Sequence, residues 1–181
     1  MRNSVWMAAL LVALVARAAW AQIPPAVAEK AYAQTTPAVC LITYSAELTN
    51  PQSGQAEKRD TRALGIIVSP GGLVMAHGHM QLENATPFNL HVTIGQGENE
   101  REYSAKLLKK PDDINVCFMQ IESDTPLNLP FVTFDRTAKM NVGDPVAIIG
   151  LLGETLDFSR ALAYRTVGSI IEKPRTTYCL D

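Results

Sequence analysis

The chain has 181 residues, with 16 basic and 18 acidic residues and a formal net charge of −2. This length provides one good-sized domain or two small ones. The charges form no basic stripe along the sequence, so nucleic acid is not an expected partner.

Residues 1–21 predict a secretory signal peptide. A basic start precedes an unbroken apolar run from Val5 to Ala16, and Ala19-Trp20-Ala21 then offers the small residues that a signal peptidase reads. The run is shorter than the roughly 20 residues that span a bilayer, and Arg17 interrupts it, which favours a cleaved signal over a membrane anchor. Cleavage near Ala21-Gln22 predicts an exported protein, periplasmic or secreted, without stable membrane insertion. The mature chain is expected to carry 14 basic and 18 acidic residues.

A short helix and a series of strands are predicted after the signal. Residues 24–35 begin with two prolines and predict the helix. Short apolar, β-branched runs bounded by turn residues then predict six strands, at 38–46, 63–69, 72–77, 88–95, 101–109 and 115–122. Residues 69–72, Ser-Pro-Gly-Gly, predict a tight hairpin, and the polar residues 49–62 predict a surface loop. The pattern indicates an all-β protein in which the first six strands form a complete small barrel.

A second group of strands follows a linker predicted at residues 123–130. Its strands are expected at 131–134, 144–150 and 161–171, with the beginning of another at 178–180. The predicted organisation is therefore a helix and first barrel over residues 22–122 and a partial second barrel over residues 131–181.

The three cysteines, Cys40, Cys117 and Cys179, each lie within an apolar run. An odd number of cysteines in buried-looking strands favours packed free thiols, with one disulfide pair as the alternative. A cysteine nucleophile is disfavoured because none of the three lies in a glycine-rich or polar turn.

Residues 64–79 carry the clearest functional pattern. A glycine-led strand, the Ser-Pro-Gly-Gly hairpin and a strand that leads to His79 resemble the trypsin-like serine proteases, and the bacterial Deg/HtrA branch most closely. The resemblance implies a chymotrypsin-like double β-barrel with His79 as the general base, because imidazole accepts and returns a proton near neutral pH. His77 departs from the family, which has a small or polar residue there, and is interpreted as a solvent-facing or capping histidine.

A second resemblance lies at residues 111–121, where the family has an aspartate leading into an apolar strand. Asn115 occupies the position of that acid. An amide carries no charge to stabilise the imidazolium, and the same exchange lowers the turnover of a serine protease by about 10⁴-fold. Asp113, two residues earlier on the same strand face, is the alternative acid.

A third resemblance covers residues 129–150 and 167–171, which are similar to the opening of the family's second barrel. The family's nucleophile lies in a Gly-[Asn/Asp]-Ser-Gly-Gly turn, which this sequence lacks, and Ser159 and Ser169 have no such glycine setting. The resemblance therefore implies a serine-type endopeptidase that acts on polypeptide substrates without a cofactor. The chain is expected to be an N-terminal fragment whose nucleophilic serine follows Asp181.

Two other functions stay open. Asn115 favours a non-catalytic relative of the same fold that binds peptides or a partner protein. His77, His79 and His91 would instead suit a metal-binding β protein, since alternate residues of a strand share one face. His-x-His is a common pattern, however, and no carboxylate stands at a fixed ligand spacing from it.

Overall fold

The structure is a computed structural model that describes residues 23–49, 55–80, 87–108, 110–111, 113–134 and 139–181. The predicted signal peptide at residues 1–21 lies outside this range. Among the helices that are described, none has the length and apolar character needed to cross a membrane. The chain forms two compact units, and the larger one comprises residues 33–134 and 150–161.

Helix α2 covers Pro25–Thr35, which confirms the helix predicted at residues 24–35. Proline suits its first position, because the N–H that proline lacks has no partner within a helix there. The single 3₁₀ turn η1 (Thr36–Ala38) follows and leads the chain into the first strand.

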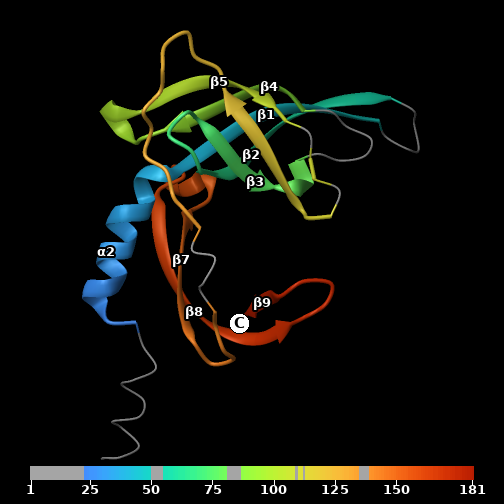
Figure 1. The fold of residues 1–181 in the computed structure, drawn as a ribbon. Helices are drawn as coiled ribbons and strands as arrows, with labels where there is room; N and C mark the ends of the chain where they lie inside the picture. The colour runs from blue at the N-terminus through green and yellow to red at the C-terminus, as the bar shows by residue number, and fades with distance from the viewer. Residues whose placement is uncertain (1–22, 50–54, 81–86, 109, 112, 135–138) are drawn as a thin grey trace, which may run out of the picture. The chain divides into compact units, whose positions relative to one another are not determined.

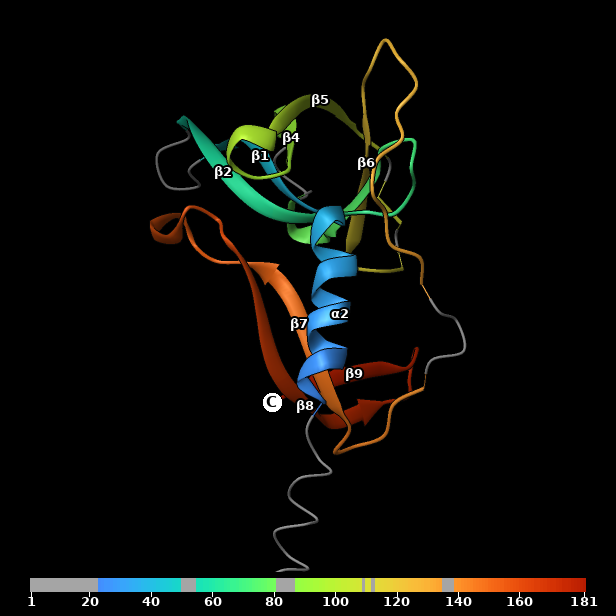
Figure 2. The same cartoon turned by 90° about the vertical axis from the view of Figure 1, so that its left-hand side faces the viewer.

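Six antiparallel strands close into a barrel in the larger unit, which confirms the predicted first barrel (Figure 1, Figure 2). The strands are β1 (Val39–Thr49), β2 (Ala56–Ile67), β3 (Leu73–His77), β4 (Pro87–Ile94), β5 (Arg101–Leu107) and β6 (Val116–Ile121). Their order around the barrel is β1-β2-β3-β6-β5-β4, and β4 closes it by pairing with β1. Strand β3 therefore lies beside β6, with His77 opposite Val116.

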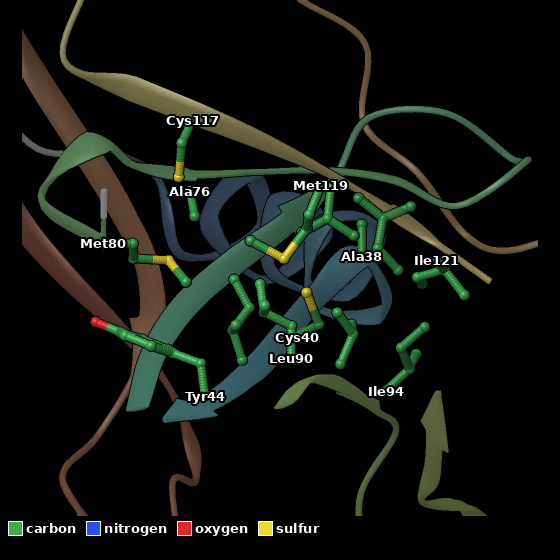
Figure 3. Packing of buried hydrophobic residues seen from close by; sticks show 14 of the residues in the cluster. Ala38, Cys40, Tyr44, Ala76, Met80, Leu90, Ile94, Cys117, Met119 and Ile121 are labelled. Atoms are coloured by element: carbon green, nitrogen blue, oxygen red, sulfur yellow. The ribbon is translucent and has the colours of Figure 1, made fainter. Parts of the chain in front are cut away.

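The barrel core is filled by inward-facing residues from all six strands. Ile42, Val92 and Met119 are completely buried in it. The sulfur atoms of Cys40 and Met119 lie near the centre of this cluster, whereas the hydroxyl of Tyr44 points away from it (Figure 3). All three cysteines are free, as predicted, and Cys40 and Cys117 are buried.

The prediction of a surface loop over residues 49–62 is wrong for its larger part. Residues 56–62 belong to β2 and pair with the end of β1, so the two strands extend as a long ribbon (Figure 1). The ribbon places Glu47 opposite Lys58, and the Ser45 hydroxyl donates a 2.6 Å hydrogen bond to Asp60. Cross-strand partners of this kind stabilise a strand that has no apolar face. Residues 50–54 lie outside the described range.

A three-stranded sheet in the order β7-β8-β9 forms the second group of strands. Its strands are β7 (Pro145–Leu151), β8 (Arg160–Ile171) and β9 (Thr177–Leu180), which confirms the strands predicted at 144–150, 161–171 and 178–180. The strand predicted at 131–134 is wrong. Instead, the Val132 N–H donates a 2.9 Å hydrogen bond to the Ile67 carbonyl, and the Val132 side chain packs against the barrel core with Leu127 and Leu129.

Candidate functional site

Two histidine rings meet where β3 ends. His77 is the last residue of β3, and the 3₁₀ turn η2 (Gly78–Met80) returns the chain so that His79 lies beside it. The ring centroids are 4.7 Å apart with the planes at 44°, and the two Nδ1 atoms are 2.6 Å apart. Gly78 and Met80 are buried, whereas His77 and His79 are exposed. The turn is thus anchored by alternate residues and presents both imidazoles at the surface.

Asn115 lies on the other side of His77, immediately before β6. Its side-chain Nδ2 is 3.2 Å from His77 Nε2, and its carbonyl accepts a 2.9 Å hydrogen bond from the Gly78 N–H. A Cβ atom at Gly78 would lie 2.8 Å from the Asn115 carbonyl carbon, closer than real Cβ atoms approach. Glycine at position 78 therefore permits the close approach of the two segments.

Cys117 fixes the backbone of His77 from the neighbouring strand. Its thiol donates to the His77 carbonyl across 3.5 Å, and its strand register pairs it with Ala76. Burial raises the pKa of the Cys117 thiol, and the positive charge of Lys110 offsets part of that rise. Cys117 is therefore a protonated, structural thiol beneath the exposed histidines.

The structure brings the predicted residues His79 and Asn115 into one cluster, but His77 stands between them. In the described part of the chain, the ring of His79 hydrogen bonds only to His77, and the side chain of Asn115 reaches His77 Nε2. Asp113 is exposed in the turn before β6 and is not among the described hydrogen-bond partners of either ring. Whether Asn115 or Asp113 acts as the partner of the general base stays a prediction.

The central position of His77 was missed from the sequence. The residue is exposed, as expected, yet it contacts both of the other members of the cluster. The available signal was its departure from the family pattern at a position two residues before the expected base.

The alternative of a metal site requires His91 as a third ligand. His91 lies on β4, where its Nδ1 atom is 3.5 Å from a carboxylate oxygen of Glu102 on the neighbouring strand β5. Among the described residues, no group of three histidine, cysteine, aspartate or glutamate side chains is placed to hold a metal ion.

Comparisons with known proteins agree with the fold. No protein-family model matches the chain. Two proteins described as probable periplasmic serine endoproteases, DegP-like, are similar in sequence: that of Chlamydia muridarum is 32% identical over 95 residues, and that of Chlamydia trachomatis serovar D is 30% identical over 95 residues. In both cases the match covers 52% of this chain and 17% of the relative.

A solved structure of the HtrA-type protease AlgW with a decapeptide superposes with a TM-score of 0.63 at 16% sequence identity. The superposition covers 83% of this chain and 48% of that one, so the chain spans about half the length of its structural neighbour. The closed six-stranded barrel followed by a second, open sheet is thus the chymotrypsin-like fold of the HtrA-type proteases. In fold, and over 95 residues in sequence, the chain is thus similar to the trypsin-like serine proteases of the Deg/HtrA branch.

Proposed function

We propose that the protein is a serine-type endopeptidase in which His79 is the general base. The supporting observation is the exposed imidazole of His79, whose Nδ1 atom is held by His77. Within the described residues its Nε2 atom has no hydrogen-bond partner, so this nitrogen is open to a hydroxyl. A general base must reach its proton across about 2.6–3.2 Å, which an accessible ring nitrogen in the turn that follows barrel strand β3 allows.

The proposed reaction hydrolyses a peptide bond by acyl transfer. His79 Nε2 removes the proton from a serine hydroxyl while the serine oxygen attacks the substrate's carbonyl carbon. The resulting imidazolium gives this proton to the leaving amine, and an acyl-enzyme ester remains. Water then attacks the ester with the same assistance from His79, which releases the carboxylic acid and restores the serine.

The nucleophile is proposed to follow Asp181 in the full-length protein, within a Gly-x-Ser-Gly-Gly turn. Such a turn also supplies the backbone N–H groups that stabilise the tetrahedral intermediate. Ser159 makes turn hydrogen bonds with Leu152 and Leu156, and Ser169 lies within β8, so both have structural roles.

Polypeptides are the proposed substrates, and the exported compartment is the proposed location. Two observations support this: the curated relatives are described as periplasmic endoproteases, and the structural neighbour was solved with a decapeptide. The apolar run at residues 5–16 is the proposed export signal.

Labelling of the full-length protein by a fluorophosphonate probe tests the proposed function, because this reagent reacts with activated serines. We expect the purified wild type to be labelled and His79→Ala to lose the label while keeping the same circular dichroism spectrum. A folded wild-type protein that takes no label, although the serine motif is present, would contradict the proposal.

The second candidate is a non-catalytic relative that binds peptides or a partner protein. It is favoured by Asn115, because no carboxylate hydrogen bonds to either histidine ring among the described residues. Under this alternative, the full-length protein takes no fluorophosphonate label but binds peptides, which fluorescence anisotropy measures. The wild type and His79→Ala then show the same background rate of peptide hydrolysis.

A further inference from the structure

We propose that His77 is a positioning residue that takes the place of the missing carboxylate and holds His79 in the tautomer required of a base. Its catalytic consequence rests on the proposed function. The structural part of the proposal, the placement of protons in the histidine pair, stands independently of any activity.

The requirement comes from the chemistry of a neutral imidazole, which carries one proton on either Nδ1 or Nε2. If His79 is to accept a proton at Nε2, its own proton must lie on Nδ1. A hydrogen-bond acceptor must then face Nδ1, and in the described structure the atom in this position is Nδ1 of His77, at 2.6 Å.

The backbone decides which of the two rings donates. The N–H of His79 donates a hydrogen bond to Nδ1 of His77 across 3.2 Å. Because a backbone N–H is a donor only, this nitrogen of His77 presents its lone pair and carries no proton. The short contact between the rings is therefore a hydrogen bond from His79 Nδ1–H to His77 Nδ1.

The same reasoning places the proton of His77 on Nε2, which faces the side-chain amide of Asn115 at 3.2 Å. A protonated Nε2 needs an acceptor, so the proposal exchanges the two ends of the Asn115 amide and assigns the near atom, placed as Nδ2, to the oxygen. The nitrogen and oxygen of an amide are told apart by such hydrogen-bond networks. The chain of hydrogen bonds runs from His79 through His77 to Asn115. Here Asn115 accepts from a neutral ring, a role that needs an acceptor oxygen but no negative charge.

Nuclear magnetic resonance of the full-length protein labelled with ¹⁵N-histidine tests the proton placement directly. The chain has only 3 histidines, and long-range ¹H–¹⁵N spectra separate protonated from unprotonated ring nitrogens. At mildly alkaline pH we expect His79 protonated on Nδ1 and His77 protonated on Nε2. A His79 ring protonated on Nε2 in the wild type would overturn the proposal without any variant being made.

Two variants and a control extend the test. His77→Ala removes the acceptor, so we expect His79 to shift toward the Nε2–H tautomer, whereas His77→Asp supplies a carboxylate and should restore Nδ1–H. His91→Ala is the matched control, because it removes a partly buried histidine on β4 whose side chain contacts Glu102 and not the pair. A His79 tautomer that is unchanged in His77→Ala would overturn the proposal.

The kinetic readout separates this proposal from the proposed function. In an active enzyme, His77→Ala should lower kcat about 100-fold with little change in KM, since the loss falls on general-base catalysis. An active wild type whose kcat does not respond to His77→Ala would refute the positioning role alone. An inactive wild type in which His79 is still protonated on Nδ1 would refute the proposed function and support the arrangement of the histidines.

Discussion

The Nδ1 atoms of His77 and His79 face each other at 2.6 Å, while Nε2 of His77 lies 3.2 Å from the side-chain amide of Asn115. A histidine thus occupies the place next to the expected base where a serine protease has a carboxylate. The site can orient its base without a charge, and among the described residues no carboxylate hydrogen bonds to either ring. The effect of a negative charge at position 115 therefore distinguishes a catalytic site from a site that only binds peptides.

Restoring the carboxylate by Asn115→Asp should raise activity. A hydrogen bond to a charged group is stronger than a neutral one by about 1 kcal/mol, which corresponds to about a fivefold gain in kcat/KM. The gain is modest because the new charge faces His77 and acts on His79 through that ring. Initial rates on a peptide substrate measure the effect.

Asp113→Asn is the companion variant, since Asp113 is the alternative to Asn115 as the partner of the base. We expect it to leave kcat/KM within twofold of the wild type. A loss of two orders of magnitude or more would identify Asp113 as the working acid and remove Asn115 from that role.

Gly78→Ala should disturb the site more than the barrel. The added Cβ would lie 2.8 Å from the Asn115 carbonyl carbon, so the two segments must separate and the hydrogen bond from Gly78 to Asn115 weakens. We expect a kcat at least tenfold lower, together with a loss of stability of about 1–3 kcal/mol from overpacking. Kinetics and urea unfolding of the same preparation measure both, and an unchanged kcat would contradict the placement of Asn115.

The barrel could be predicted from the sequence because its strands alternate between the core and the surface. Residues Leu90, Val92 and Ile94 of β4 follow this alternation and are all buried. The extension of β2 over residues 56–62 could not be predicted in this way, because all seven residues are polar or exposed and their strand is fixed by pairing with β1. A polar composition indicates that a segment is exposed, but it does not indicate whether the segment pairs with another strand.

The site was predicted in part. Motif order predicts that His79 and Asn115 lie close together, and the pairing of β3 with β6 does bring their two segments together. Asn115 contacts His77, however, and not His79. His77 lies between His79 and Asn115 because the single 3₁₀ turn η2 follows β3 and brings the ring of His79 against the ring of His77. In an extended strand His77 and His79 would point the same way without facing each other, so no periodicity in the sequence could indicate their contact.

Gly65→Ala should destabilise the barrel. A Cβ at this buried position would lie 2.7 Å from Ile42 Cδ1, 2.8 Å from Cys40 Sγ and 2.9 Å from Val74 Cγ1. Adding a methyl group to a filled core costs about 1–3 kcal/mol, measurable as a lower urea midpoint at constant slope.

Gly153→Ala is the control for this substitution, because a Cβ there meets no atom within 4 Å and the backbone has a negative φ of −71°. We expect a change within about 0.5 kcal/mol, as is usual at surface positions. Equal effects of the two substitutions would mean that the region around Gly65 is not packed as the structure shows.

The buried thiol of Cys40 should make the stability of the barrel fall at alkaline pH. Burial raises the pKa of Cys40 to about 12 from the ordinary value of 9.0, although the Arg160 guanidinium offsets part of the rise. In the unfolded chain the thiol loses its proton above its ordinary pKa, whereas in the folded barrel it keeps that proton up to about pH 12. The stabilisation from the protonated thiol is therefore complete below about pH 9 and is lost as the pH rises toward 12.

The free energy of unfolding is expected to fall by at most about 1.4 kcal/mol per pH unit, the limit for a single group that titrates in one state only. Urea unfolding at pH 7.5, 9 and 10 measures it, and the difference between wild type and Cys40→Ala isolates Cys40 from the tyrosines and lysines that also titrate. The variant is less stable at neutral pH because it leaves a cavity, but the gap to the wild type should narrow above about pH 9. A gap that is constant from pH 7.5 to 10 would show that Cys40 is accessible to solvent in the folded protein.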